Sequence, residues 1–271
     1  MLKQRIITGL ALLPIALGGV FLLPTQWFAI FLGAVITLGA WEWANLSGFS
    51  AQWQRILYAL LTGSALIGFY SMPASFLLGA GLVWWLTALM LVISYPDSSS
   101  AWKLRAIRLV IGWVVLIPAW RGLVFLKGQG VPEFEQQGNA LILYVFVLVW
   151  GADVGAYFSG KAFGKRKLAP HLSPGKTWEG VMGGMLLITL VALGVSWYRE
   201  LAMFQTLALL AVTWAVGLVS VLGDLLESMF KRERGIKDSS QLLPGHGGIL
   251  DRIDSLTAAV PVFSVFWLLA N

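Results

Sequence analysis

The sequence contains no cysteine, which excludes disulfide bonds and any metal site built from thiolates. Charge is also scarce, because Asp, Glu, Lys and Arg together make up 12% of the chain while hydrophobic residues make up 58%. A soluble fold could not bury so much apolar surface. The mean hydropathy of +0.79 therefore indicates an integral membrane protein. The net charge of +6 comes from cations clustered in short loops, where membrane topology explains them better than a nucleic-acid partner, and none is expected.

Long apolar stretches predict an all-α, polytopic membrane protein with about nine transmembrane helices. The basic start of the chain resembles a secretory signal, but no small-residue cleavage site follows, so the first stretch is expected to remain a span. No repeat or long linker is present, which indicates a single transmembrane domain over residues 1–271, with N-terminal helices in 1–139 and catalytic helices and cytoplasmic loops in 140–271. The nine stretches are residues 6–23, 27–46, 56–70, 74–95, 107–126, 140–159, 181–197, 202–230 and 249–270.

Lys and Arg predict the orientation, because loops rich in these residues stay in the cytoplasm. With a cytoplasmic N-terminus, all of the 19 Lys and Arg residues except Arg121, Lys127 and Arg199 fall on the cytoplasmic side. An odd number of spans then places the C-terminus outside. This pattern is typical of a multi-pass protein of a bacterial cytoplasmic (inner) membrane, with its active site facing the cytoplasm.

Acidic residues gather near the cytoplasmic ends of the predicted spans. Asp153 lies seven residues from the end of its span, which places it roughly 10 Å below the surface at about 1.5 Å per residue. On the eighth span Asp224, Glu227 and Ser228 share one helical face, and on the ninth Asp251 and Asp254 do the same. The carboxylates expected in the inner third of the membrane are Glu42, Asp153, Glu179, Asp224, Glu227, Asp251 and Asp254.

Carboxylates crowded at this depth need a neutralising partner. Oxygen ligands without cysteine favour Mg²⁺. The alternative is that Asp251 pairs with Arg252 or Lys231 and that acids in the first turn of a helix only complement its dipole. For Glu42, which lies between two Trp residues, structural hydrogen bonding and a role in the site are both open.

Two cytoplasmic segments have features of phosphate binding. Residues 173–180 (SPGKTWEG) place hydroxyl groups and Lys176 immediately before a helix, where free backbone N–H groups favour an anion. This is not a Walker A loop, and no strand is expected before it. Residues 245–248 (GHGG) allow close approach of the backbone to a ligand. For His246, between glycines and beside the acids, a structural and a catalytic role are both open, whereas a structural role is favoured for His171.

Residues 228–254 follow the pattern S-x-x-K-R-x4-K-D-x-S-x2-L-P-x-H-G-G-x-x-D-R-x-D. With this pattern the C-terminal half resembles the phosphatidate cytidylyltransferase family, also called CDP-diacylglycerol synthases. A local departure is Ser239-Ser240-Gln241, where the family pattern leads us to expect Phe-Gly-Asn or a similar tripeptide. The upstream residues Asp153, Tyr157, Gly160, Gly164 and Lys165 and the segment 173–180 are also similar to that family. The residues that carry the main signature are Ser228, Lys231, Arg232, Lys237, Asp238, Pro244, His246, Gly247, Gly248, Asp251, Arg252 and Asp254.

The resemblance implies transfer of CMP from CTP to phosphatidic acid, with Mg²⁺ and possible help from a monovalent cation such as K⁺. It also implies contact with membrane lipids and a homodimer. The expected metal ligands are Asp224 and Asp251, with Asp254 and Asp153 as further ligands. The expected catalytic residues are Lys176, Lys231, Arg232, Asp224 and Asp251. The expected substrate-binding residues are Ser173, Lys176, Thr177, Ser228, Lys231, Arg232, Lys237, His246 and Arg252.

Two other functions were weighed against this one. A transporter would need polar groups through the full membrane thickness, whereas the predicted outer half holds little besides Arg121, which can reach outward to the surface. A membrane phosphotransferase acting on CDP-linked lipids would need a D-G-x2-A-R signature, which the sequence lacks.

Overall fold

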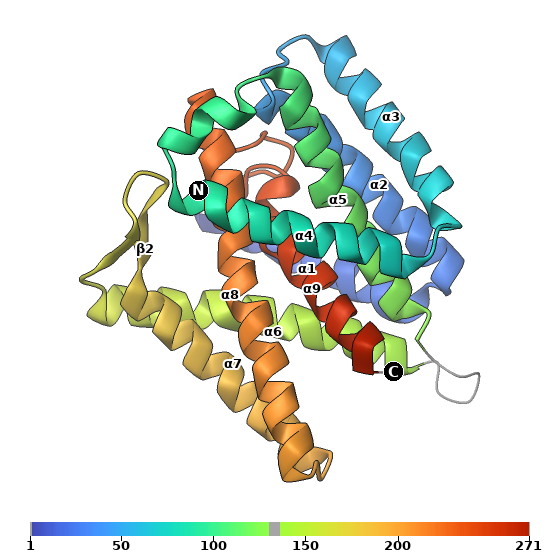
Figure 1. Ribbon diagram of the computed structural model, residues 1–271, viewed down its shortest axis with the longest axis vertical. Coiled ribbons are helices and arrows are strands. Elements are labelled where there is room, and N and C mark those ends of the chain that lie inside the picture. Colours follow the sequence, from blue (N-terminus) through green and yellow to red (C-terminus); the bar gives the residue numbers. More distant parts are fainter. Residues whose placement is uncertain (1, 130–135, 271) are drawn as a thin grey trace.

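The computed structural model describes residues 2–129 and 136–270, without the side chains of 2–7 and 136. Within these ranges an α-helix lies at each of the nine predicted stretches (Figure 1). The helices are α1 (Leu2–Leu22), α2 (Thr25–Leu46), α3 (Gln52–Tyr70), α4 (Ala74–Ile93), α5 (Arg105–Lys127), α6 (Gln136–Phe163), α7 (Trp178–Tyr198), α8 (Met203–Arg234) and α9 (Leu250–Ala270), with a 3₁₀ helix, η1 (Asp97–Trp102), between α4 and α5.

Seven of the described helices, α2 and α4 to α9, are long and apolar enough to cross a membrane. In α1 the residues whose side chains are described, Thr8–Leu22, are also apolar, and α3 does not reach the same hydropathy as the seven. The all-α, polytopic prediction is therefore confirmed at this level. The number of crossings and the sides on which the termini lie stay predictions.

One expectation was wrong, because the segment before α7 contains strands. Strands β1 (Lys167–Ala169) and β2 (Ser173–Thr177) form an antiparallel pair, with Lys167 opposite Thr177 and Ala169 opposite Ser173. Figure 1 shows this hairpin projecting at one side of the molecule, next to the ends of α6 and α7. The predicted phosphate-binding segment therefore lies on a short strand that leads directly into a helix.

Glycines permit close contact between the helices that surround the acids. A Cβ atom on Gly155 of α6 would lie 2.7 Å from the carbonyl oxygen of Gly183 in α7. A Cβ atom on Gly223 of α8 would lie 2.5 Å from the carbonyl oxygen of Asp254 in α9. The backbones of these pairs therefore nearly touch, and only residues without a side chain allow α6 to approach α7, and α8 to approach α9, so closely. The homodimer stays a prediction.

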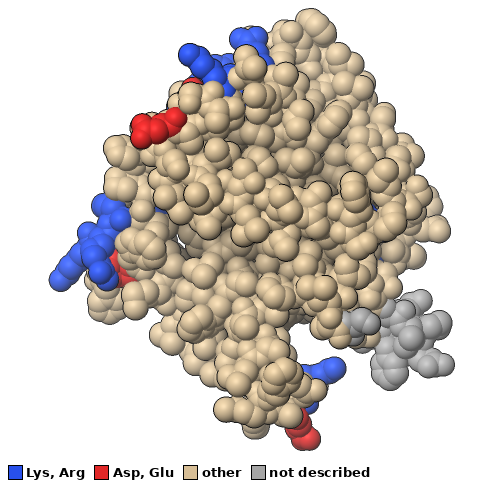
Figure 2. All heavy atoms as spheres, in the orientation of Figure 1, with Lys and Arg blue, Asp and Glu red and all other residues tan. Residues whose placement is uncertain are grey.

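The surface has a broad uncharged region, as expected for a protein surrounded by lipid. Figure 2 shows charged side chains on the visible face mainly along its upper and left margins and at the tip of the α7–α8 hairpin. Exposed apolar side chains cover the helices between these regions, for example Ile67, Ile93 and Leu186. Such a surface would be unfavourable in water and is stabilised by hydrocarbon.

Candidate active site

The inner part of α8 carries the first half of the site. Ser228 Oγ donates to Asp224 Oδ1 at 3.2 Å, which confirms that these residues share a helical face. The other oxygen, Asp224 Oδ2, lies 2.7 Å from Lys176 Nζ on β2. The β1–β2 hairpin thus places the ammonium group of Lys176 next to the carboxylate of Asp224 on α8. This ion pair joins two of the predicted site residues across about fifty positions of sequence.

Lys231 connects α8 with α9 through two carboxylates. Its Nζ donates to Glu227 Oε2 at 2.6 Å and to Asp251 Oδ1 at 2.8 Å. The Lys231 side chain is only 12% exposed, so both contacts lie away from water. Pairing of Asp251 with Lys231, one of the two alternatives that the sequence left open, is therefore present in the structure.

Asp251 also holds the loop that precedes α9. Its Oδ2 accepts hydrogen bonds from Ser239 N at 2.9 Å, Ser239 Oγ at 2.8 Å and Gly248 N at 2.6 Å. Gly247 has a φ of 82°, and a Cβ atom there would lie 2.6 Å from Asp251 Oδ2, so only glycine fits at this point. Both oxygens of Asp251 are engaged, and a metal ion bound to this residue would have to displace Lys231 or the loop.

Glu42 forms a second anchor for the same loop, and its role was open in the sequence. It is fully buried on α2. Glu42 Oε1 accepts from Ser240 Oγ at 2.5 Å and from Ile249 N at 3.0 Å, while Oε2 accepts from Leu250 N at 2.6 Å. The carboxylate therefore caps the first turn of α9 from another helix. Ser239 and Ser240, which depart from the family pattern, supply hydroxyl groups to the two anchors.

The remaining acids define a polar centre around Asp224. It lies within electrostatic range of Asp153 on α6 and of Asp254 on α9. Glu227 interacts in the same way with Asp254. Glu179 does not join them, because its carboxylate accepts from the backbone N–H groups of Lys165 and Arg166 at the end of the hairpin. The predicted gathering of acids is thus confirmed for the residues of α6, α8 and α9 only.

The donor chemistry of this centre fits a Mg²⁺ ion. Glu227 Oε1 is buried and has no hydrogen-bond partner in the described part of the chain, so an oxygen ligand is available there. In the residues that the structure describes, no three Asp, Glu or His side chains converge on a single point. A cation at Asp224 would therefore have to take the place now held by the Lys176 ammonium group.

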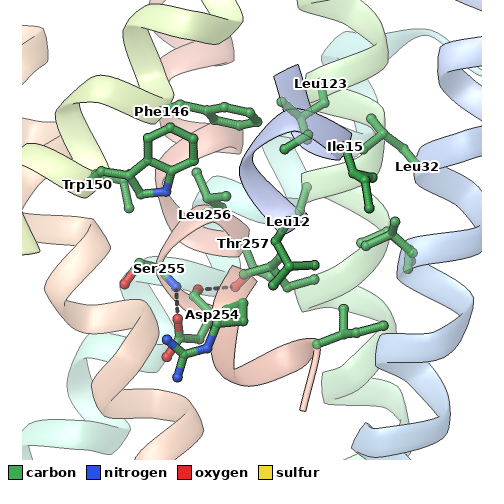
Figure 3. A pocket seen from close by; sticks show the side chains of 18 of the residues that line it. Leu12, Ile15, Leu32, Leu123, Phe146, Trp150, Asp254, Ser255, Leu256 and Thr257 are labelled. Carbon is green, nitrogen blue, oxygen red and sulfur yellow. Dashed lines mark hydrogen bonds between the residues drawn. The ribbon is translucent and has the colours of Figure 1, made fainter. Parts of the chain in front are cut away.

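Two cavities meet at Asp153. One has a volume of about 370 Å³ and lies between α6, β2, α7 and α8, where Lys161 and Lys176 are in its wall. The other has a volume of about 480 Å³ and is mostly apolar (Figure 3). In this view the side chains of Phe146 and Leu123 lie at the end of the cavity away from Asp254, and Leu12 lies between them. Because Asp153 lines both, an ionic reactant and an apolar one can reach the same carboxylate.

The other predicted site residues have mixed placements. Thr177 Oγ1 accepts from Gly180 N at 3.2 Å and caps α7, so its oxygen already has a structural role. Arg232 Nε donates to Leu172 O at 2.9 Å and holds the hairpin on α8. Both roles are positional in the structure, and substrate contact by these residues stays a prediction.

The predicted residues that remain can face a ligand. His246 lines the apolar cavity with a buried Nδ1 that has no hydrogen-bond partner among the described residues. Arg252 is exposed and lines the same cavity. Lys237 is exposed on the loop before α9, and Ser173 is half-buried at the start of β2.

The fold and the site together define a polytopic membrane protein with a polar centre between a cationic and an apolar cavity. The profile of the cytidylyltransferase family matches residues 3–270. The chain belongs to this family, and it is therefore a nucleotidyltransferase.

Several similar proteins are named phosphatidate cytidylyltransferase. The chain is 56% identical to the one from Pseudomonas aeruginosa over 266 residues, which cover 97% of this chain and 96% of the relative. It is 43% identical to the one from Haemophilus influenzae over 290 residues, which cover 98% of this chain and 99% of the relative. It is 39% identical to the one from Bacillus subtilis over 160 residues, which cover 59% of this chain and 58% of the relative. The resemblance drawn from the C-terminal motifs thus extends over the whole chain.

Proposed function

We propose that this enzyme transfers CMP from CTP to phosphatidic acid and releases pyrophosphate. A phosphate oxygen of phosphatidate forms a bond to the α-phosphorus of CTP, and the bond from this phosphorus to the oxygen shared with the β-phosphorus breaks. The product, CDP-diacylglycerol, remains in the bilayer for phospholipid synthesis. The observation that carries this proposal is the position of Asp153 and the Lys176–Asp224 pair where a cationic cavity meets an apolar one.

The chemistry requires positioning more than proton transfer. The phosphate group of the lipid is already an anion, so it needs no strong base, but its approach to a triphosphate must be made electrostatically favourable. Lys176 is suited to the phosphates of CTP because it lines the cationic cavity. Arg252 and His246 line the apolar cavity near its polar end and are suited to the phosphate of the lipid. Lys231 and Arg232 fix α8 against α9 and the hairpin.

A Mg²⁺ ion, held by Asp224 and Asp254 with Asp153 and Glu227 nearby, would supply charge neutralisation at the phosphates. When phosphates and the ion enter, Lys176 would release Asp224 and bind a phosphate oxygen instead. Asp251 then keeps the loop before α9 in place through Ser239 and Gly248. A monovalent cation such as K⁺ would be a further neutralising group in the same centre.

The same proposal includes nine membrane crossings, a cytoplasmic N-terminus and an outer C-terminus in a bacterial inner membrane. Lys and Arg are concentrated in the loops at one end of the predicted spans, which supports this orientation. CTP then arrives from the cytoplasm and the lipid from the inner leaflet. We include a homodimer in the proposal on the family resemblance alone.

The test is incubation of purified protein with labelled CTP and phosphatidic acid, with Mg²⁺ or with EDTA. We expect labelled CDP-lipid and pyrophosphate only with Mg²⁺. Asp224→Asn should abolish turnover while leaving membrane insertion and thermal unfolding near those of the unchanged protein. Absence of CDP-lipid in the Mg²⁺ sample would refute the proposed reaction, and full activity of Asp224→Asn would refute the ligand assignment.

A further inference from the structure

Helix α1 covers the apolar cavity without filling it. The helix is tied at one end, where Thr8 Oγ1 donates to Pro244 O at 2.9 Å, and at the other, where Lys127 Nζ donates to Val20 O. Between these contacts, Leu12 and Ala16 line the cavity of about 480 Å³. Protein interiors are normally close-packed, so a helix whose middle borders an open space of this size is better suited to a ligand than to a core.

The lining changes in character along the cavity. Figure 3 shows Leu123 and Phe146 at its apolar end, Asp254 at the opposite end and Leu12 between them. Asp251 and Arg252 of α9 and Asp153 of α6 also line the cavity, so most of its charged groups come from the first turns of α9. A molecule with an ionic head and a long hydrocarbon tail matches such a lining, whereas a nucleotide does not.

The lining of the cavity follows most of α1 and includes two fully buried side chains. Along α1 it extends from Gly9, next to His246, to Val20, which is roughly 16 Å at about 1.5 Å per residue. Val20 and Phe28, which are 2% and 1% exposed, lie at the end away from His246. A hydrocarbon chain that enters beside the ionic groups would therefore meet a limit at these two side chains.

We propose that this cavity binds one acyl chain of the lipid substrate and that the inward face of α1, at Leu12 and Ala16, determines which chains fit. The proposal rests on the proposed function for the identity of the lipid. It assigns to α1 a role in substrate selection, although residues 8–22, whose side chains the structure describes, contribute none of the acidic or cationic groups of the site.

Substitutions on α1 test the proposal through chain length. Ala16→Phe fills the cavity, while Ala11→Phe places the same ring at an exposed position that does not line it. An excluded chain segment stays in the hydrocarbon of the bilayer, so the loss is one of packing inside the cavity, and the KM should rise about fivefold or more. For Ala16→Phe we expect this rise with dioleoyl phosphatidate, little change with dioctanoyl phosphatidate and an unchanged KM for CTP. Ala11→Phe should behave like the unchanged protein.

Equal losses with both lipids, or equal effects of the two substitutions, would overturn the proposal. Ala16→Leu provides a smaller change if the Phe variant unfolds, and Trp fluorescence during heating reports folding of each variant. The expected order of effects on dioleoyl phosphatidate is Ala16→Phe, then Ala16→Leu, then Ala11→Phe.

A binding measurement separates this proposal from the reaction itself. Phosphatidate with a photoreactive diazirine in one acyl chain should label peptides of α1 around Leu12 and Ala16, and Ala16→Phe should reduce this labelling. Phosphatidylcholine with the same acyl group should label α1 at least about tenfold less, and equal labelling by both lipids would refute a substrate site. Labelling of α1 without CDP-lipid formation would refute the reaction and leave the acyl site standing. CDP-lipid formation without labelling of α1 would refute the acyl-chain site and support the proposed reaction.

Discussion

Removal of the Glu42 carboxylate is the sharpest test of how the site is held together. In Glu42→Ala, the backbone N–H groups of Ile249 and Leu250 and the hydroxyl group of Ser240 lose their buried acceptor. An unsatisfied buried polar group costs about 1 to 3 kcal/mol, so the loss should total roughly 3 to 6 kcal/mol after partial relaxation. This is a large part of the stability of a typical domain.

The expected result is a lower Tm together with slower turnover. At roughly 2 to 4 °C per kcal/mol for a chain of this size, the Tm should fall by about 6 °C or more. Turnover should fall by about 100-fold even below the Tm, because α9 positions Asp254 and a displacement of about 1 Å can cost that much. Glu42→Gln should give an intermediate result, because its amide group can present only one acceptor oxygen to these donors.

Heating of the detergent-solubilised protein can be followed by Trp fluorescence, since the chain contains 14 Trp residues. CMP transfer is measured on the same samples at a temperature at which all variants are folded. Glu200→Ala, at an exposed position between α7 and α8, is the control and should change neither quantity. Wild-type Tm and turnover in Glu42→Ala would refute the view that this residue anchors the start of α9.

Two further substitutions test the extent of the site. Lys176→Met should lower turnover by about 100-fold or more, because it removes a cation beside Asp224. The control, Arg166→Met, loses an exposed ion pair, so it should keep its activity and change the free energy of unfolding by less than about 1 kcal/mol. Similar activity losses in both variants would contradict a specific role of Lys176. Arg121→Met should leave turnover within about twofold, as measured by CMP transfer, because its Nη2 donates to Met72 O near the outer end of the predicted fifth span. A severe loss there would mean that the site extends outward.

The sequence predicts the helices well because hydrocarbon imposes a length and an apolar composition on each of them. The segment between α6 and α7 does not follow this rule of apolar length, and strands β1 and β2 in it were not predicted. These strands have three and five residues and lie among charged side chains, so neither apolar length nor alternation marks them. The consequence is functional, since the hairpin carries Lys176 to Asp224.

Local spacing also predicts which acids share a helical face, but not which cations they meet. The i and i+4 spacing relates Asp224 to Ser228, and the structure has that hydrogen bond. The second partner of each acid comes from elsewhere, as when Lys231 reaches Asp251 across 20 positions. Such pairs depend on how helices pack, which glycines such as Gly223 decide by allowing close approach.

Glu42 and Glu179 show why a shared depth in the membrane is weak evidence for a shared site. Both were placed with the other acids by their position along a predicted span, yet each binds backbone N–H groups at a different chain reversal. Glu42 receives them from residues 207 and 208 positions away, and Glu179 from residues 13 and 14 positions away. A carboxylate used in this way has few free lone pairs for a metal ion or a substrate. Depth therefore selects candidates, and the count of hydrogen bonds already accepted indicates which of them, Asp153 and Asp254 first, have oxygens left to bind a cation beside the phosphates.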